Sequence, residues 1–363
     1  MKLLIITQKV DRKDPVLGFF HNWVIKLAPN FDQINTICLE SGEHALPHNV
    51  KVFSLGKVTS SASPRGDGNL SIFNFQFSIF KRLKYIWNFY KYIWNLRHDY
   101  DAVFVHMNQE YVILGWKLWK LWGKKIFLWR NHPRGNWLTR LAVLVSDKVF
   151  CTSPQSFTAR YRKTQLMPVG VDLEKFKDEK KERVKNSILF LGRMDRIKRP
   201  DLLVGALGVL AEGQTDFTCD FYGDPTNSRD LYYSEVQDLV SDLGLQDKVR
   251  FHSAIPNGQT PAIYAKHEIF VNLTPTGSMD KTIIEAVACG CLPILANLSL
   301  RGELEDMFFI KKEDEENVAM TLQSLMDLGG LEKEEQRKKL AEYARRQGLD
   351  ILISKLTTAI KNV

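Results

Sequence analysis

Short apolar runs alternate with helix-forming stretches along this chain, and the alternation restarts near the middle of the sequence. In the first half, the runs that read as buried strands are Lys2–Thr7, Ile34–Leu39, Val50–Phe53, Ala102–His106, Lys125–Trp129 and Lys148–Thr152. In the second half they are Ser187–Leu191, Thr218–Tyr222, Val249–His252, Ile269–Leu273 and Pro293–Ala296. Apolar strands separated by helices are typical of a parallel sheet with helices on both faces. The sequence therefore predicts an α/β protein with two doubly wound units.

The length of the chain agrees with two units. It has 363 residues, whereas a single hydrophobic core stops growing at roughly 250–300 residues. A polar linker, Asp172–Asn186, contains five lysines and one arginine and separates the two sets of runs. We expect one domain over residues 1–170 and a second over 171–345. The last segment, 346–363, is expected to form a helix that packs back on the N-terminal domain.

Charge is distributed unevenly between the halves. Residues 1–165 have a net charge of +14 and residues 166–363 a net charge of −6. The basic half favours an anionic partner, such as a membrane surface or a phosphorylated lipid. Nucleic acid is disfavoured because no recognised nucleic-acid-binding module accompanies the charge.

Nothing in the sequence predicts secretion, membrane insertion or a disulfide framework. No apolar run approaches the ~20 residues of a membrane helix, and no signal-peptide core is visible. The five cysteines are scattered and lack a CxxC pair, which favours buried thiols in a reducing compartment. We therefore expect a cytoplasmic protein, with a peripheral position on the inner face of the membrane as an alternative.

A basic motif follows the first strand of the second half. The segment Phe190–Pro200 reads FLGRMDRIKRP, so Gly192 and Arg193 come directly after a strand and Lys198 stands five residues beyond Arg193. An arginine and a lysine that converge at a strand end can hold a diphosphate. The alternative interpretation is a solvated basic loop, and the spacing alone does not exclude it.

A second motif, Pro275–Pro293, reads PTGSMDKTIIEAVACGCLP. It predicts a Gly-Ser turn followed by a helix, with Asp280 as the N-cap, Glu285 near the middle and Gly290 at the end. The free N–H groups of such a helix start attract phosphate. Glu285 could accept two hydrogen bonds from the vicinal hydroxyls of a ribose, or it could be a surface glutamate.

Together these motifs resemble the retaining family 4 glycosyltransferases of the GT-B fold. "GR…K" corresponds to Gly192, Arg193 and Lys198, and Glu285–Gly290 (EAVACG) is similar to the family's "EAMACG". Weaker matches run along the rest of the chain: Gly18 in the first loop, His106 at a strand end, His132 at the next strand end, Ser153, the linker entry Pro168–Asp172 and the pair Tyr222–Gly223.

The resemblance implies a GT-B architecture, in which two Rossmann-like domains face a cleft. The N-terminal domain would bind the acceptor, and the C-terminal domain would bind the nucleotide sugar, with UDP- or GDP-sugars expected first. It implies transfer with retention, without a metal or another cofactor, to a lipid-linked or growing surface or capsular polysaccharide. The catalytic residues implied are His106, Arg193 and Lys198. The donor-binding residues implied are Gly18, Gly192, Arg193, Lys198, Ile255, Pro256, Gly277, Ser278, Met279, Asp280, Lys281 and Glu285.

Within that set, the resemblance gives each group a role. Arg193 and Lys198 would hold the diphosphate, Glu285 the ribose, and backbone groups near 254–257 the base. His106 would contact the transferred sugar. His132 could lie near the sugar or the acceptor, or it could make a structural hydrogen bond.

The chain departs from the family pattern at Gly277. The family usually has a glutamate eight residues before the second one, in an E-x7-E pattern, and uses it to bind the donor sugar. Ser278, Asp280 or Lys281 could take over those contacts, and the sequence does not decide among them.

The alternative function is a non-catalytic homologue that binds sugar nucleotides. A nicotinamide dehydrogenase is disfavoured because no G-x-G-x-x-G follows the first strand.

An aromatic and basic helix is predicted at Ile79–Leu96. Its apolar residues recur at helical spacing, and no acidic residue occurs from Gly68 to His98. Packing on the sheet is one interpretation. Contact with an anionic membrane surface beside a lipid-linked acceptor is the other.

Overall fold

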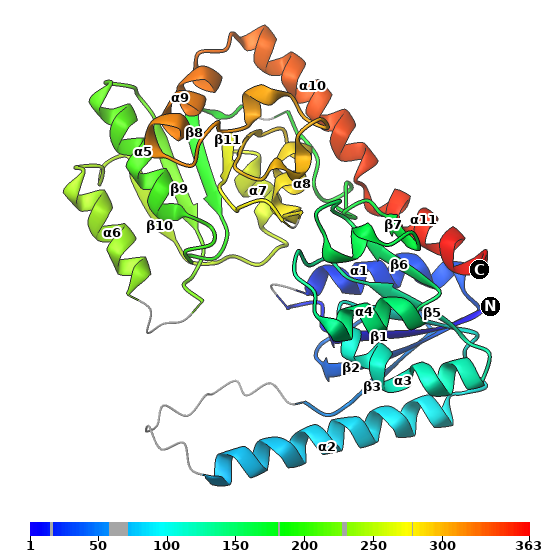
Figure 1. Cartoon of the computed structure of the whole chain (residues 1–363). Coiled ribbons are helices and arrows are strands. Elements are labelled where there is room, and N and C mark those ends of the chain that lie inside the picture. The colour runs from blue at the N-terminus through cyan, green and yellow to red at the C-terminus, as the bar shows by residue number, and fades with distance from the viewer. Residues whose placement is uncertain (15–16, 58–71, 181, 227–230, 278) are drawn as a thin grey trace. The chain divides into compact units, whose positions relative to one another are not determined.

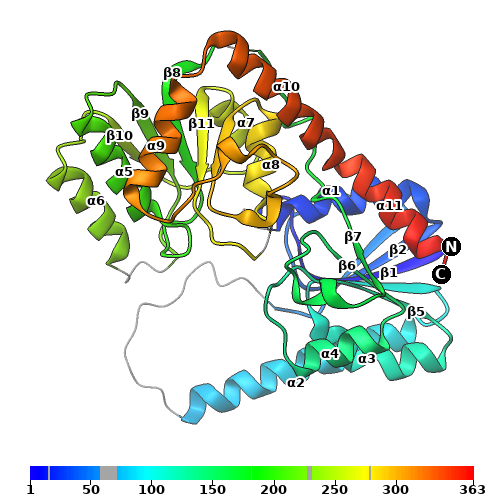
Figure 2. The same ribbon diagram turned by 45° about the horizontal axis from the view of Figure 1, so that its top comes forward.

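The computed structural model describes residues 1–14, 17–57, 72–180, 182–226, 231–277 and 279–363, with the side chains of helix α2 from Arg82 onward. The chain divides into two compact units. The first unit comprises Met1–Met167 and Ile353–Val363, and the second unit comprises Pro168–Leu352. Each contains a parallel sheet flanked by helices (Figures 1 and 2). The predicted α/β class with two doubly wound units is therefore confirmed.

The first unit has a seven-stranded sheet in the order β3-β2-β1-β4-β5-β6-β7. Its strands are β1 (Lys2–Val10), β2 (Gln33–Ser41), β3 (Val50–Ser54), β4 (Ala102–His106), β5 (Lys125–Trp129), β6 (Lys148–Cys151) and β7 (Thr164–Leu166). Its helices are α1 (Gly18–Leu27), α2 (Ile72–Asn95), α3 (Gln109–Leu121), α4 (Trp137–Val145) and the greater part of α11 (Leu349–Lys361). In Figure 1, α2, α3 and α4 lie on one side of the sheet and α1 and α11 on the other. Because the central strands are covered on both faces, their residues are continuously apolar.

The second unit has a five-stranded sheet in the order β10-β9-β8-β11-β12. Its strands are β8 (Val184–Leu191), β9 (Thr218–Tyr222), β10 (Val249–His252), β11 (His267–Asn272) and β12 (Leu292–Leu295). Its helices are α5 (Pro200–Glu212), α6 (Tyr232–Asp242), α7 (Thr260–Tyr264), α8 (Lys281–Ala288), α9 (Glu315–Met326) and α10 (Gly330–Arg346). Strand order reverses between β8 and β11, and ligands of open α/β sheets bind beyond the carboxyl ends of strands at such a point.

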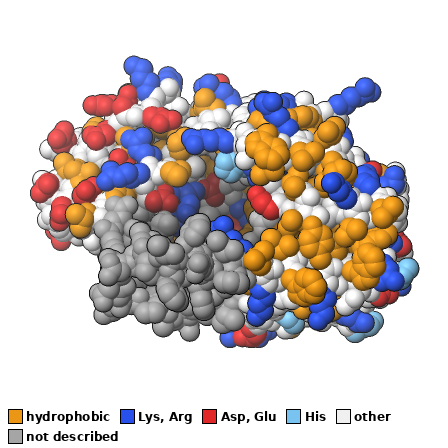
Figure 3. Space-filling view, turned by 60° about the horizontal axis from the view of Figure 1, so that its bottom comes forward, with side chains coloured by type: hydrophobic (Ala, Val, Ile, Leu, Met, Phe, Trp, Pro, Cys, Tyr) orange, Lys and Arg blue, Asp and Glu red, His pale blue; other side chains and the backbone are white. Residues whose placement is uncertain are grey.

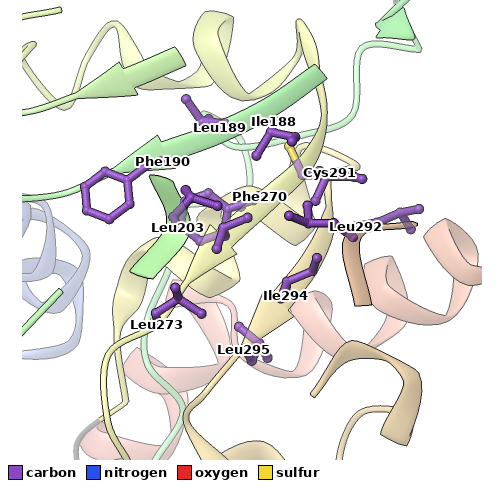
Figure 4. Close-up of a cluster of buried hydrophobic side chains, with 14 of the residues drawn as sticks. Ile188, Leu189, Phe190, Leu203, Phe270, Leu273, Cys291, Leu292, Ile294 and Leu295 are labelled. Atoms are coloured by element: carbon purple, nitrogen blue, oxygen red, sulfur yellow. The ribbon is translucent and has the colours of Figure 1, made fainter. Parts of the chain in front are cut away.

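The core of the second unit lies between its sheet and helices. Ile188, Phe270 and Leu292, from three neighbouring strands, are fully buried and lie together in the cluster of Figure 4. All five cysteines are buried free thiols, as their scattered spacing predicts. In the described part of the chain, no helix combines the length and apolar character needed to cross a bilayer.

Candidate functional site

The carboxyl ends of β8 and β9 are joined backbone to backbone. The Gly192 N–H donates to the Tyr222 carbonyl at 3.0 Å, and the Gly223 N–H donates to the His252 carbonyl at 3.0 Å. A Cβ atom on Gly223 would lie 1.8 Å from the Gly192 carbonyl oxygen, so only glycine fits there. The loop that contains the "GR…K" motif is thereby held against the next strand end.

Arg193 and Lys198 leave this loop in different environments. The Arg193 side chain is 59% exposed and lies 3.5 Å from Asp195, measured from Nε to Oδ2. The Lys198 side chain is only 18% exposed. Its ammonium donates to the Thr274 hydroxyl at 3.1 Å and to the Asp280 carboxylate. The structure therefore brings Lys198 to the start of α8, whereas Arg193 extends into solvent.

Asp280 caps the N-terminus of α8, which confirms the capping role read from the sequence. Its Oδ1 accepts from the Thr282 N–H at 3.4 Å and from the Thr282 hydroxyl at 2.9 Å, and its Oδ2 accepts from Asn272 Nδ2 at 3.0 Å. Burial acts to raise the pKa of Asp280, but Lys198 and these hydrogen bonds outweigh it and hold the pKa below its usual range. Asp280 is therefore an ionised partner of Lys198 at neutral pH.

Glu285 is buried on α8, so the surface-glutamate interpretation is wrong: its exposed fraction is 4%. Burial raises the pKa of Glu285 to about 7, against the opposing effects of Lys281, Asn257 and Lys175. Lys281 stands one turn earlier on the same helix, and burial lowers its pKa to about 8. A buried carboxyl beside a half-buried lysine, with converging pKa values, is typical of a ligand-binding or catalytic site.

Two residues outside the predicted set complete this cluster. Asn257 Nδ2 donates to Glu285 Oε1 at 3.5 Å, and Lys175 Nζ donates to Asn257 Oδ1 at 2.5 Å. The sequence indicated only backbone groups near Asn257, and Lys175 was one of five linker lysines with nothing to distinguish it. Only the structure singles out Lys175, because the buried Phe176 ring, 2% exposed, fixes the turn from which Lys175 extends.

The other predicted donor residues lie near this cluster in the chain. Ile255 and Pro256 are in the β10–α7 segment that leads to Asn257, and Gly277 is buried in the turn before α8. Met279 is half-buried and packs against the core of the unit. Ser278 lies outside the described residues.

The remaining predicted residues lie in the first unit. His106 is 1% exposed, its Nδ1 lies 3.3 Å from the Thr7 hydroxyl, and its ring stacks on Phe20 with centroids 4.0 Å apart. Gly18 is the first residue of α1 rather than part of the preceding loop. His132 is exposed, and its Nδ1 accepts from the Arg134 N–H at 3.0 Å, which is a local structural hydrogen bond.

Helix α2 has two different faces. Phe89 and Ile93 are fully buried in the core of the first unit, which confirms that this helix packs on the sheet. The opposite face leaves Trp87 73% and Trp94 52% exposed. Apolar side chains gather widely on the surface shown in Figure 3, with lysines and arginines among them.

Two cavities lie along α2 and α3. The larger, of about 440 Å³, is lined by Gln8, Leu39, Arg82, Tyr85, Ile86, Phe89, Asn108, Glu110, Tyr111 and Leu114. The smaller, of about 290 Å³, is lined by Trp87, Tyr90, Lys91, Trp94, Asn95 and Leu118. The Tyr90 hydroxyl, which donates to the Leu114 carbonyl at 3.0 Å, joins the two helices.

The chain is similar to known proteins both in sequence and in fold. Over 227 residues it is 26% identical to spore coat protein SA of Bacillus subtilis, a match that spans 56% of this chain and 59% of that protein. It is also 26% identical over 140 residues to D-inositol 3-phosphate glycosyltransferase 1 of Catenulispora acidiphila, covering 35% of this chain and 33% of that protein. Both matches span less than two thirds of the relative's length.

The fold is shared over the whole chain. HepE of Anabaena, solved in complex with UDP, superposes with a TM-score of 0.76 at 16% identity, covering 100% of both chains. The same protein in complex with UDP-glucose superposes with a TM-score of 0.70 at 16% identity, covering 100% of this chain and 98% of HepE. A family model described as "Glycosyl transferases group 1" matches residues 171–347. By that match, the chain contains a domain of the glycosyl transferases group 1 family, on a GT-B fold.

Proposed function

We propose that this chain is a glycosyltransferase that moves a sugar from a nucleoside diphosphate sugar to an acceptor, with retention at the anomeric carbon. The observation that supports this best is the group of side chains at α8. A cation, Lys198, stands at the helix N-terminus, and a buried carboxyl, Glu285, lies one and a half turns inside. This arrangement suits a ligand with phosphates at one end and a diol at the other.

The diphosphate would bind at the start of α8. The ammonium of Lys198 has three N–H groups, of which Thr274 and Asp280 accept two. The third can donate to a β-phosphate oxygen. Arg193, exposed and adjacent, can move to the same phosphate as a planar, two-pronged donor. Helix N–H groups add a favourable dipole for an anion.

These groups also provide the catalysis. As the bond between sugar and phosphate breaks, negative charge develops on the β-phosphate, and fixed cations stabilise that charge more than they stabilise the bound donor. The acceptor hydroxyl approaches on the side of the leaving group and gives its proton to a phosphate oxygen. This mechanism requires neither a metal nor another cofactor.

Glu285 would bind the ribose. Its pKa of about 7 means that the carboxyl is divided between its ionised and neutral forms at neutral pH. Two ribose hydroxyls that donate to the carboxylate favour the ionised form. UDP-sugars are the first donors to test, because HepE, which shares the fold, has been solved with UDP-glucose.

His106 would contact the transferred sugar. Its ring is covered by Phe20, with Trp23 and Trp129 also around it. Contact with a sugar therefore requires the first turn of α1 to move. If it does not move, His106 supports the β1–α1 packing and the sugar is bound by other groups, with His132 and the turn at Gly277 as candidates.

The acceptor would bind to the first unit, with a lipid-linked or growing surface polysaccharide as the class proposed. The exposed aromatic face of α2 and the basic net charge of residues 1–165 suit an anionic membrane surface. The cavity of about 440 Å³ beside α2 is mostly apolar, and its polar lining residues are Gln8, Arg82, Asn108 and Glu110. A peripheral position on the cytoplasmic side of the membrane would place these groups beside a lipid-linked acceptor.

A panel of UDP-, GDP- and ADP-sugars in a thermal-shift assay tests the donor half, because binding to the folded state raises Tm. Transfer to an acceptor and donor hydrolysis are then measured with the donors that bind. No stabilisation by any nucleotide would contradict the proposal. Binding with neither transfer nor hydrolysis would favour the alternative, a non-catalytic sugar-nucleotide binder. That alternative is suggested by Gly277, which replaces the first glutamate of the E-x7-E pattern.

A further inference from the structure

Lys175 lies in the linker entry, in a turn whose geometry is fixed by its neighbours. Asp172 accepts through its backbone oxygen from the N–H of Lys175 at 3.2 Å and of Phe176 at 2.9 Å. The Phe176 ring, 2% exposed, packs against Tyr264 with centroids 6.2 Å apart. The Lys175 ammonium lies 5.0 Å from the centre of the Phe176 ring and points to Asn257.

The contact with Lys175 determines which way the Asn257 amide faces. An ammonium can only donate, so the atom 2.5 Å from Lys175 Nζ must be the amide oxygen. The amide nitrogen then faces Glu285 Oε1, 3.5 Å away, and an NH₂ group can only donate. The three side chains therefore form a directed chain of hydrogen bonds that ends on a carboxylate and disfavours its protonated form.

We propose that Lys175 is a positioning residue of the nucleoside site, which orients Asn257 and through it holds Glu285 as the carboxylate that accepts the ribose hydroxyls. This inference rests on the proposed function. It assigns the linker a role in substrate affinity, and it assigns Lys175 no contact with the substrate.

Other titratable groups surround Glu285. Lys281 lies on α8, and Asp280 and the Cys289 thiol are at its two caps. The linker contributes Lys175 and Asp172, which acts through both lysines, and α7 contributes the Tyr264 hydroxyl. Lys281 and Lys175 favour ionisation of Glu285, whereas Asp280 opposes it. Loss of Lys175 removes one of two cations, so the midpoint for ionisation must move upward.

The first measurement is UDP affinity by calorimetry between pH 5.5 and 8 for the parent, Lys175→Met and Lys175→Arg. UDP affinity should rise with pH in all three proteins. The midpoint of this rise should lie roughly 0.5–1 pH unit higher in Lys175→Met than in the parent. That shift weakens binding about three- to tenfold below the parent midpoint. Lys175→Arg should restore the parent profile. Lys177→Met, an exposed lysine of the same linker, is the matched control and should not change it.

The second measurement needs no nucleotide. Carboxyl-carbon NMR of the full chain, with the Glu285 signal identified by its loss in Glu285→Gln, gives the Glu285 midpoint directly. It should be higher in Lys175→Met than in the parent and in Lys177→Met. An equal midpoint in parent and Lys175→Met overturns the inference, whatever the affinities. A shifted midpoint in a protein that binds no nucleotide would support the hydrogen-bond chain and contradict the proposed function.

Discussion

The ammonium of Lys198 pairs with the carboxylate of Asp280, the residue that caps helix α8, across 82 residues of sequence. The charge of the phosphate-binding lysine implied by the motif is thus balanced by the carboxylate of Asp280. Asp280 fixes the position of Lys198 before a ligand arrives, and part of the electrostatic attraction for phosphate is given up in return.

Lys198→Ala and Arg193→Ala should each lower turnover at least about a hundredfold, the scale of losing one transition-state donor. They should differ in stability, because Lys198→Ala leaves the Asp280 carboxylate without its cation whereas Arg193 is largely exposed. Steady-state kinetics and chemical denaturation measure the two effects. Arg196→Ala, which removes an exposed arginine of the same loop, is the control and should be near normal. Near-normal turnover in either variant would remove that residue from the phosphate site.

Glu285→Gln should weaken nucleoside diphosphate binding about ten- to a hundredfold at pH 8, because charged hydrogen bonds are worth roughly 1.5–3 kcal/mol. The parent's affinity should rise with pH through about 7, the pKa of Glu285, and the variant's profile should lose that midpoint. Calorimetry at several pH values checks both points. Equal affinity in the two proteins at pH 8 would contradict the placement of the donor.

Glu285→Gln should weaken nucleotide binding but increase the stability of the folded protein. Folding raises the pKa of Glu285 from about 4.5 to about 7. Below pH 4.5 the carboxyl is neutral in both the folded and the unfolded state. The free energy of unfolding then decreases as pH rises to the folded-state pKa of about 7, because ionisation of the buried carboxyl is disfavoured. The free energy of unfolding of Glu285→Gln should therefore increase relative to that of the parent, by on the order of 1–3 kcal/mol, between pH 5 and pH 8. Urea unfolding at the two pH values measures it; a constant difference would show that burial of this charge has no energetic cost.

Gly277→Glu restores the acidic position of the E-x7-E pattern. We expect free UDP affinity to change less than about threefold, because the proposed nucleotide contacts are made by Lys198 and Glu285 and not by the turn that contains Gly277. The preferred donor sugar should change. Transfer or hydrolysis rates with UDP-glucose, UDP-galactose and UDP-N-acetylglucosamine would report the preference. An unchanged preference with normal UDP binding would mean that this position does not read the sugar.

Membrane contact through α2 predicts that co-sedimentation with anionic liposomes falls with rising salt. It should also fall after Lys84→Gln with Lys91→Gln, and further after Trp87→Ala, whose indole is 73% exposed. Lys311→Gln with Lys312→Gln, two exposed lysines of the second unit, is the matched control. If neither salt nor the α2 substitutions change liposome binding, α2 has only its packing role.

The sequence was most informative where a local pattern determines the structure. The apolar runs predicted the parallel strands, and Asp280 followed by an apolar helix predicted an N-cap that the structure contains. Contacts between distant segments were not predictable. Nothing in the linker distinguishes Lys175 from its neighbours, because its contact with Asn257 depends on the fold of residues 82 positions later. Likewise, the strand pattern predicts that His106 ends β4 but cannot reveal that Phe20 covers its ring.

The order of the segments along the chain matters during synthesis. Ile353–Val363 belong to the first unit although they follow every residue of the second. Leu356 and Ile360 are buried, at 0% and 1% exposure, and Lys361 lies 5.5 Å from the centre of the Phe31 ring. A nascent chain released from the ribosome as far as residue 352 can close the second unit's core but leaves an apolar face of the first unit uncovered. The part of the protein made first is therefore the part that finishes folding last, and its uncovered face is where a chaperone would bind.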